Sequence, residues 1–152
     1  MRHHAVVRTR IVVLVSAAAV AAAVAVVALA STGASGLPAY TNGYAKWPRI
    51  NKKPFTSTGP LSSAHSGVKN VYASKRKVGK RYPNGTVIVK TIQPGGRKGV
   101  PYQVAVMRKV GGSWRYVEYQ LSGSRYTILA QGGLCQSCHA QARANDFVFT
   151  KR

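Results

Sequence analysis

Acidic side chains are almost missing from this chain of 152 residues. Glu118 and Asp146 are the only two, against 23 lysines and arginines, so the formal net charge is +21 at pH 7. Such a balance attracts anionic partners. The cations are spread along the chain, with one dense group at residues 75–81. The pattern therefore favours a solvated basic face that attracts acidic proteins or lipid head groups, and not a nucleic-acid site.

Cysteine is equally scarce, which excludes a disulfide framework. The two cysteines, Cys135 and Cys138, stand in the run Cys-Gln-Ser-Cys-His that ends at His139. A redox dithiol, a single disulfide or half of a zinc site are open alternatives for such a pair. No βαβ pattern surrounds it, however, and His65 is the only other histidine outside the N-terminal segment. A four-ligand zinc site is therefore hard to assemble.

The C-x-x-C-H spacing is typical of covalent c-type haem attachment. Two thiols three residues apart lie within one helical turn, where each can add to a porphyrin vinyl group, and the adjacent imidazole then falls beneath the iron. We therefore predict a covalently bound haem that is attached through Cys135 and Cys138, with His139 as the ligand to iron.

One long apolar run is present, at the N-terminus. Arg2, Arg8 and Arg10 precede an apolar stretch over residues 11–30, which ends in Ala-Leu-Ala, a site that a signal peptidase could cut before Ser31. The stretch is also long enough to span a bilayer, so an uncleaved membrane anchor is the alternative. Either way the rest of the chain is expected to be exported to the periplasm or another extracytoplasmic space, where bacteria attach c-type haem.

The chain divides into three segments on this interpretation. Residues 1–30 are a signal peptide or anchor. Residues 31–45 are rich in Gly, Ser, Thr and Ala, which predicts a flexible linker, and residues 46–152 form a haem domain. There is no internal repeat.

The haem domain has the pattern of an antiparallel β-sheet. Strand-forming residues separated by turn signals predict strands over residues 68–73, 86–92, 102–109 and 114–121. Short glycine turns between them indicate a meander. Alternation in the second strand puts Lys90 on one face with Ile88 and Ile92, where a lysine at a sheet edge can extend its amine to solvent.

The C-terminal part is less regular. Residues 126–130 are ambiguous between a strand and a short helix, and residues 135–144 should be helical because they are rich in Ala and Gln without Gly or Pro. The predicted fold class is mainly β, or α+β: an antiparallel sheet with a few short helices, and a haem held against the sheet by the C-terminal C-x-x-C-H helix.

Several motifs together resemble the cytochrome P-460 family. Its members pair a C-terminal C-x-x-C-H with a D-x-V-F-T segment, as residues 135–139 and 146–150 do here. Residues 84–90, Asn-Gly-Thr-Val-Ile-Val-Lys, resemble the P-x-G-T-V-x-V-K strand of the family, and residues 114–116, Trp-Arg-Tyr, resemble its tryptophan-bearing strand. The resemblance covers residues 46–152.

The resemblance implies a β-rich domain with one haem, with His139 as proximal ligand and an open distal side of the iron. In characterised members a lysine cross-links to the porphyrin rim, and those enzymes oxidise hydroxylamine. By motif that lysine corresponds to Lys90. A related group, the beta-type cytochromes c-prime, carries phenylalanine there and binds nitric oxide or other small gases. Lys90 therefore favours a hydroxylamine oxidoreductase, and a non-enzymatic electron-transfer or gas-binding protein is the alternative.

Few side chains are available to complete such a site. Hydroxylamine oxidation releases protons, so a carboxylate base would help. Asp146 is expected to anchor the C-terminal segment, which leaves Glu118, although a glutamate in mid-strand also pairs readily with a cation. Met107 and His65 are the alternative sixth ligands. Packing is the commoner fate of a strand methionine, and a loop histidine is more often at the surface.

The predicted partners follow from the same observations. We expect a small nitrogenous ligand such as hydroxylamine or nitric oxide, and an acidic electron-transfer protein that the basic surface attracts. Nucleic acid is not expected, a membrane is expected only if the N-terminal segment is retained, and a homodimer is left open.

Overall fold

The computed structural model describes residues 36–57, 65–96 and 99–150, and every structural statement below concerns these residues. The stretch predicted to be a signal peptide or anchor lies outside them. Within the described ranges, no helix is long and apolar enough to cross a membrane.

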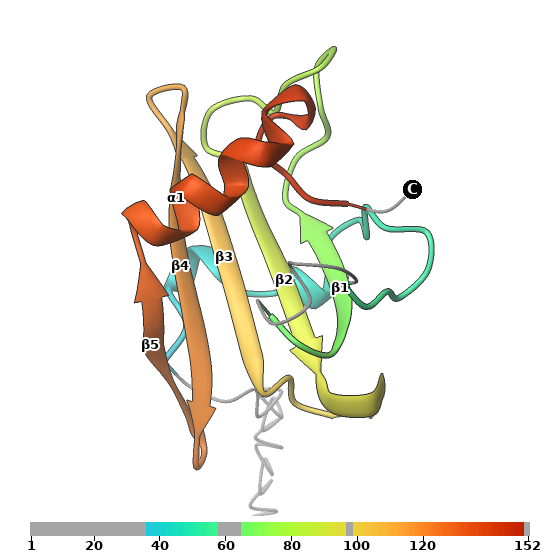
Figure 1. Cartoon of the computed structure of the whole chain (residues 1–152), viewed down its shortest axis with the longest axis vertical. Helices are drawn as coiled ribbons and strands as arrows, with labels where there is room; N and C mark the ends of the chain where they lie inside the picture. Colours follow the sequence, from blue (N-terminus) through green and yellow to red (C-terminus); the bar gives the residue numbers. More distant parts are fainter. Residues whose placement is uncertain (1–35, 58–64, 97–98, 151–152) are drawn as a thin grey trace, which may run out of the picture. The chain divides into compact units, whose positions relative to one another are not determined.

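Five strands form one antiparallel sheet in the order β1-β2-β3-β4-β5 (Figure 1). Their bounds are β1 Val68–Ala73, β2 Val87–Gln93, β3 Gln103–Val110, β4 Ser113–Ser122 and β5 Arg125–Gln131. Gly111 and Gly112 join β3 to β4 with φ values of 57° and 80°, as a two-residue hairpin turn with positive φ at both positions requires. The predicted mainly-β meander is confirmed.

The predicted elements agree with the structure to within one or two residues, except near the C-terminus. The ambiguous residues 126–130 belong to strand β5. The predicted helix starts earlier, as α1 (Gly133–His139), and continues after His139 as the 3-10 helix η5 (Ala140–Asn145). A further short 3-10 helix, η4 (Pro94–Gly96), follows β2.

The two faces of the sheet carry separate apolar clusters. On the face crossed by α1, the buried side chains are Val71, Ala73, Tyr82, Ile88, Met107, Trp114, Tyr116 and Val148. On the opposite face, the buried side chains are Val87, Val89, Val104, Val106, Tyr119 and Tyr126. Figure 1 shows α1 in front of the sheet and the cyan residues 39–46 behind it. The alternation predicted for β2 is therefore confirmed, since Ile88 and Val89 belong to different clusters.

The segment before β1 differs from the flexible linker that its composition predicts. Residues 36–45 include the 3-10 helix η1 (Ala39–Thr41), and η2 (Tyr44–Lys46) follows. Leu37, Tyr44 and Trp47 pack on the second cluster. These apolar side chains cover the outer face of the sheet, which is the face opposite α1. The Gly and Ser content of the segment gave no sign of this packing.

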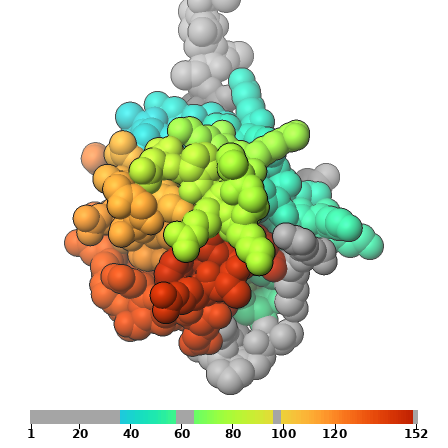
Figure 2. Space-filling view, turned by 90° about the horizontal axis from the view of Figure 1, so that it is seen from above, coloured from blue at the N-terminus to red at the C-terminus, as the bar shows by residue number. Residues whose placement is uncertain are grey.

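The connection between β1 and β2 contacts the C-terminal segment. Figure 2 shows the yellow-green connection beside the red C-terminal residues. Lys77 Nζ donates to Asn145 Oδ1 over 2.6 Å, and the backbone N–H of Tyr82 donates to Asp146 Oδ2 over 2.7 Å. These bonds tie the residues that follow α1 to the connection between β1 and β2.

Candidate functional site

A row of four side chains crosses the sheet on the α1 face. Register pairs Val71 with Lys90, Lys90 with Ala105, and Ala105 with Glu118. Alternate strands of a sheet lie roughly 10 Å apart. The small Ala105 therefore leaves a hollow between the longer side chains of Lys90 and Glu118.

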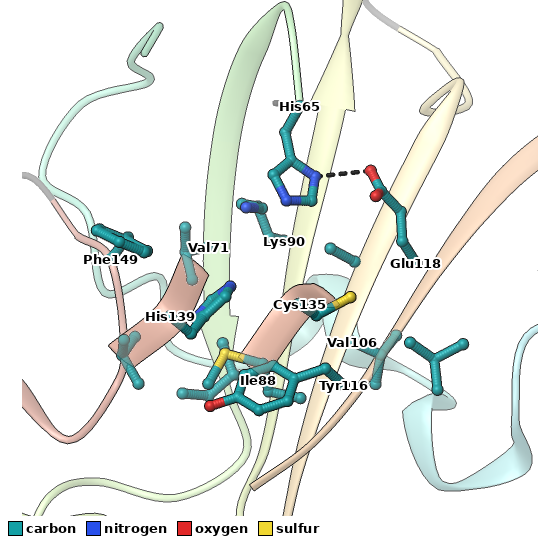
Figure 3. Close-up of a pocket in the computed structure, with 14 residues that line it drawn as sticks. His65, Val71, Ile88, Lys90, Val106, Tyr116, Glu118, Cys135, His139 and Phe149 are labelled. Atoms are coloured by element: carbon teal, nitrogen blue, oxygen red, sulfur yellow. Dashed lines mark hydrogen bonds and ion pairs between the residues drawn. The ribbon is translucent and has the colours of Figure 1, made fainter. Parts of the chain in front are cut away.

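This hollow is part of a cavity between the sheet and the C-terminal residues. Its empty volume is about 450 Å³, including open space at its mouth. A second row of register partners, Ile88, Met107 and Tyr116, forms its apolar wall. In Figure 3 the charged side chains gather at the end of the cavity away from Tyr116.

His139 is held in the cavity wall in a state suited to bind a metal. It is 9 % exposed, and its Nδ1 lies 2.7 Å from the Phe147 carbonyl oxygen. A carbonyl only accepts hydrogen bonds, so Nδ1 carries the proton and Nε2 keeps a lone pair. Burial lowers the pKa of His139 to about 4, against the opposing hydrogen bond to Phe147. Near pH 7 the ring is therefore neutral.

Two aromatic rings fix the plane of the His139 imidazole. The Tyr116 ring centroid lies 4.7 Å from that of His139, and the Phe149 centroid lies 5.2 Å from it. Burial raises the pKa of Tyr116 to about 12, with smaller effects from Asp146 and Cys135. Tyr116 is thus a neutral packing partner at physiological pH.

The two cysteines lie on α1 with His139 and are not joined in a disulfide. Both are free thiols and partly buried. Cys135 lines the cavity, and burial, with Glu118 next in size, raises the pKa of its thiol. A thiol on the cavity wall, four residues before a buried imidazole, fits attachment of a porphyrin from one side.

Lys90 points into the cavity and does not reach solvent at a sheet edge, because β2 is an inner strand (Figure 3). Burial lowers the pKa of its amine to about 8, although the nearby Glu118 carboxylate opposes the shift. In the described part of the chain the amine has no hydrogen-bond or ion-pair partner. Its predicted position on the Ile88 face is confirmed, and the edge interpretation is wrong.

Glu118 also faces the cavity, and it is paired with a histidine. His65 Nδ1 lies 2.6 Å from Glu118 Oε1, and both residues line the cavity. Figure 3 shows the pair at the end of the cavity beyond Lys90. The surface position expected for His65 is therefore wrong: its loop, with φ of 57° at this residue, directs the ring inward.

Asp146 and Met107 have the packing roles that the sequence favours. The Asp146 carboxylate accepts hydrogen bonds from Lys109 and from the backbone of Tyr82 and does not line the cavity. Met107 is 6 % exposed and is part of the apolar cluster. Met107 is paired in register with Tyr116, so it lies at the end of the cavity where Tyr116 contacts His139. His65 lies at the opposite end of the cavity.

The sequence did not single out Ala105, Tyr116 or Phe149, although all three line the cavity. The alternation that groups Tyr116 with Glu118 was a usable signal, and Phe149 stands inside the D-x-V-F-T run. Ala105 has no signal of its own, because a small residue in a strand is notable only when its neighbours across the sheet are known.

The residues present fit a haem better than a protein-ligated metal ion. Among the described residues, no three His, Cys, Asp or Glu side chains converge on one point. A haem iron needs only one or two protein ligands, because the porphyrin supplies the others. The cavity combines a neutral imidazole, an adjacent thiol and an apolar wall, which are the groups that hold a haem.

Comparison with known proteins agrees with this chemistry. The model of the cytochrome P460 family matches residues 41–150, a range that includes all residues of the cavity wall. It begins before residue 46, within the segment that covers the outer face of the sheet. Among curated proteins, none matches the sequence closely enough to show a relationship.

Proposed function

Because the chain belongs to the cytochrome P460 family, which implies a haem cofactor, we propose that it is an exported monohaem c-type oxidoreductase that oxidises hydroxylamine. The supporting observation is the row in which an amine and a carboxylate, Lys90 and Glu118, flank the hollow at Ala105. We further propose that Cys135 and Cys138 attach the haem covalently.

The haem, when bound, supplies an iron with an exchangeable position for a nitrogen ligand and accepts electrons from it. His139 would offer Nε2 to that iron, because its Nδ1–H is held by the Phe147 carbonyl. A neutral imidazole has no proton to lose on binding a metal. The packing of Tyr116 and Phe149 against the ring keeps its orientation fixed.

Glu118 is the proposed acceptor for the protons that hydroxylamine releases. Of the two acidic side chains, it alone lines the cavity. His65 holds its carboxylate in place over 2.6 Å and provides a second basic group to which a proton can pass. A pair of this kind lets the base be restored between turnovers.

Lys90 is the proposed neighbour of the porphyrin rim. With a pKa of about 8, a useful fraction of its amine is unprotonated near neutral pH, and only that form is a nucleophile. Such an amine is suited to the cross-link that the family resemblance implies.

A non-enzymatic role in electron transfer or gas binding is the second candidate, and His65 favours it. Its imidazole lies at the end of the cavity opposite the Tyr116 wall. If His65 left Glu118 and served as a second protein ligand of the iron, the site would be closed to substrate and suited to electron transfer.

We propose that the electron acceptor is an acidic protein. A second cleft is bordered by the cations Lys80, Arg81 and Arg143 and shares Tyr116 with the haem cavity. Tyr116 in turn contacts His139. An acidic partner bound over this cleft would be close to the iron ligand, and charge attraction would speed the encounter.

The test is to produce the chain in a host competent for cytochrome c maturation and to compare it with Lys90→Ala. We expect the mature protein to carry the mass of one haem, a red-shifted ferrous Soret band and hydroxylamine turnover, and the variant to lose the last two. Lys52→Ala, an exposed lysine, is the control. An ordinary c-type spectrum without turnover supports the second candidate, and no haem mass contradicts both.

A further inference from the structure

We infer that the buried Lys109–Asp146 pair is a positioning device for the iron ligand, and that it acts on His139 through the Phe147 carbonyl. The inference deepens the proposed function and rests on His139 being the ligand. It assigns a purpose to the one ion pair of the described residues that lies outside the cavity.

The pair connects the C-terminal segment to the rigid sheet. Lys109 Nζ lies 2.7 and 3.0 Å from the two carboxylate oxygens of Asp146, and the side chains are 5 % and 6 % exposed. Lys109 is on β3, paired in register with Trp114 on β4. Burial raises the pKa of Asp146, but the hydrogen bonds from Lys109 and Tyr82 outweigh it and hold the pKa below its ordinary value.

The backbone immediately after this anchor is in a conformation that needs support. Asp146 and Phe147 have φ values of 55° and 63°, in the left-handed region that residues with a Cβ seldom adopt. The Phe147 N–H donates to Ala142 O over 2.9 Å. Two such residues in succession reverse the chain and aim the Phe147 carbonyl at His139 Nδ1, 2.7 Å away.

The consequence for His139 is specific. In the described part of the chain, Phe147 O is the only hydrogen-bond partner of its Nδ1. A hydrogen bond at the remote nitrogen fixes the tautomer and raises the basicity of the nitrogen that binds a metal. If the anchor loosens, the carbonyl can move away, and the imidazole loses both effects.

A purely stabilising role explains the pair less well. Buried ion pairs often contribute less to stability than apolar side chains of the same size, because both charges must be desolvated. Asp146, one of the two acidic side chains of the chain, lies in the turn whose Phe147 carbonyl accepts the hydrogen bond from His139. Positioning uses the directionality of the ion pair, which an apolar contact lacks.

The experiment uses the full haem-loaded protein and the variants Asp146→Asn and Lys109→Gln. Each weakens the pair from one side. We expect both to raise the reduction potential of the haem and to lower the iron–histidine stretching frequency of the ferrous protein, because His139 becomes a weaker donor. Lys109→Arg keeps the ion pair and should retain wild-type values.

Asn51→Ala is the matched control. Asn51 is 1 % exposed, and its Oδ1 accepts a bond of 2.7 Å from Val71 N, so this variant should lower the Tm without altering either readout. The inference is overturned if Asp146→Asn and Lys109→Gln lower the Tm but leave the potential and the stretching frequency unchanged. It is also overturned if Asn51→Ala shifts them equally.

Failure of the proposed function is distinguishable from failure of this inference. A protein that binds haem but does not oxidise hydroxylamine still reports the iron–histidine stretch. If no haem is attached, ¹⁵N NMR of His139 in the unloaded chain replaces that readout: the Nδ1–H tautomer should dominate in the wild type and lose population in Lys109→Gln. Equal tautomer populations in the two proteins would overturn the inference.

Discussion

Lys90 lies in the cavity wall and, among the residues that the structure describes, its amine has no hydrogen-bond or ion-pair partner, so its buried charge destabilises the unloaded fold. Its pKa falls from 10.5 to about 8, mainly through burial. Between these values the unfolded chain binds more protons than the folded one, so stability rises with pH across this window and the full cost applies below pH 8. Lys90 therefore lowers the stability of the unloaded fold, as functional groups often do.

Lys90→Met should remove this cost. In an unloaded chain with both cysteines replaced by serine, we expect the free energy of unfolding at pH 7 to rise by about 3 kcal/mol. The gain should shrink toward zero above pH 10.5, where Lys90 is neutral in both states. Urea denaturation at both pH values measures it, with Lys52→Met as the exposed control. An equal gain at both pH values would mean that charge burial is not the cause.

Glu118→Gln tests the proposed proton acceptor. The amide keeps the size of the carboxylate but cannot take a proton, so we expect kcat for hydroxylamine to fall about 100-fold or more, with haem attachment unchanged. His65→Asn should cause a smaller loss, because the base remains. Gln120→Ala, an exposed change on the same strand, is the control, and turnover in Glu118→Gln near the wild-type rate would remove Glu118 from the mechanism.

At the scale of elements, the strands were predictable and the contacts between distant segments were not. Side chains alternate with period two, so the direction of Lys90 followed from β2 alone. His65 lies in a loop without periodicity, and its partner Glu118 is 53 residues away. Likewise the bond between Lys109 and Asp146 spans 37 residues, so sequence predicted an anchoring role for Asp146 but not its partner.

The row across β2, β3 and β4 predicts a sensitive position at Ala105. Ala105→Leu would fill the hollow between Lys90 and Glu118, so we expect the fraction of protein carrying haem, measured by intact mass, to fall several-fold while the chain stays folded. Val104→Leu is the control, because Val104 is fully buried in the cluster on the opposite face. Overpacking there costs about 1–3 kcal/mol and should leave haem attachment normal.

At the scale of the molecule, the charge distribution separates two roles. Both acidic side chains are used internally, Glu118 with His65 and Asp146 with Lys109. Asp146 also lines the cleft that Lys80, Arg81 and Arg143 border, but its carboxylate is 6 % exposed and is paired with Lys109. Long-range attraction to an acidic partner therefore comes from the excess of cations over the whole molecule. A docking site, by contrast, must depend on where the charges lie.

Neutralising the cleft cations tests whether docking is local. We expect Lys80→Gln, Arg81→Gln and Arg143→Gln together to slow electron transfer to an acidic ferredoxin-type acceptor about tenfold at low salt, because steering falls with lost charge and rising ionic strength. The control replaces Lys46, Lys52 and Lys53, which are also exposed, and removes the same net charge. Stopped-flow rates across a salt series measure both. Equal slowing in the two triple variants would mean that only total charge matters. A larger effect of the cleft variant would locate docking beside Tyr116, the side chain that lines the cleft and contacts His139.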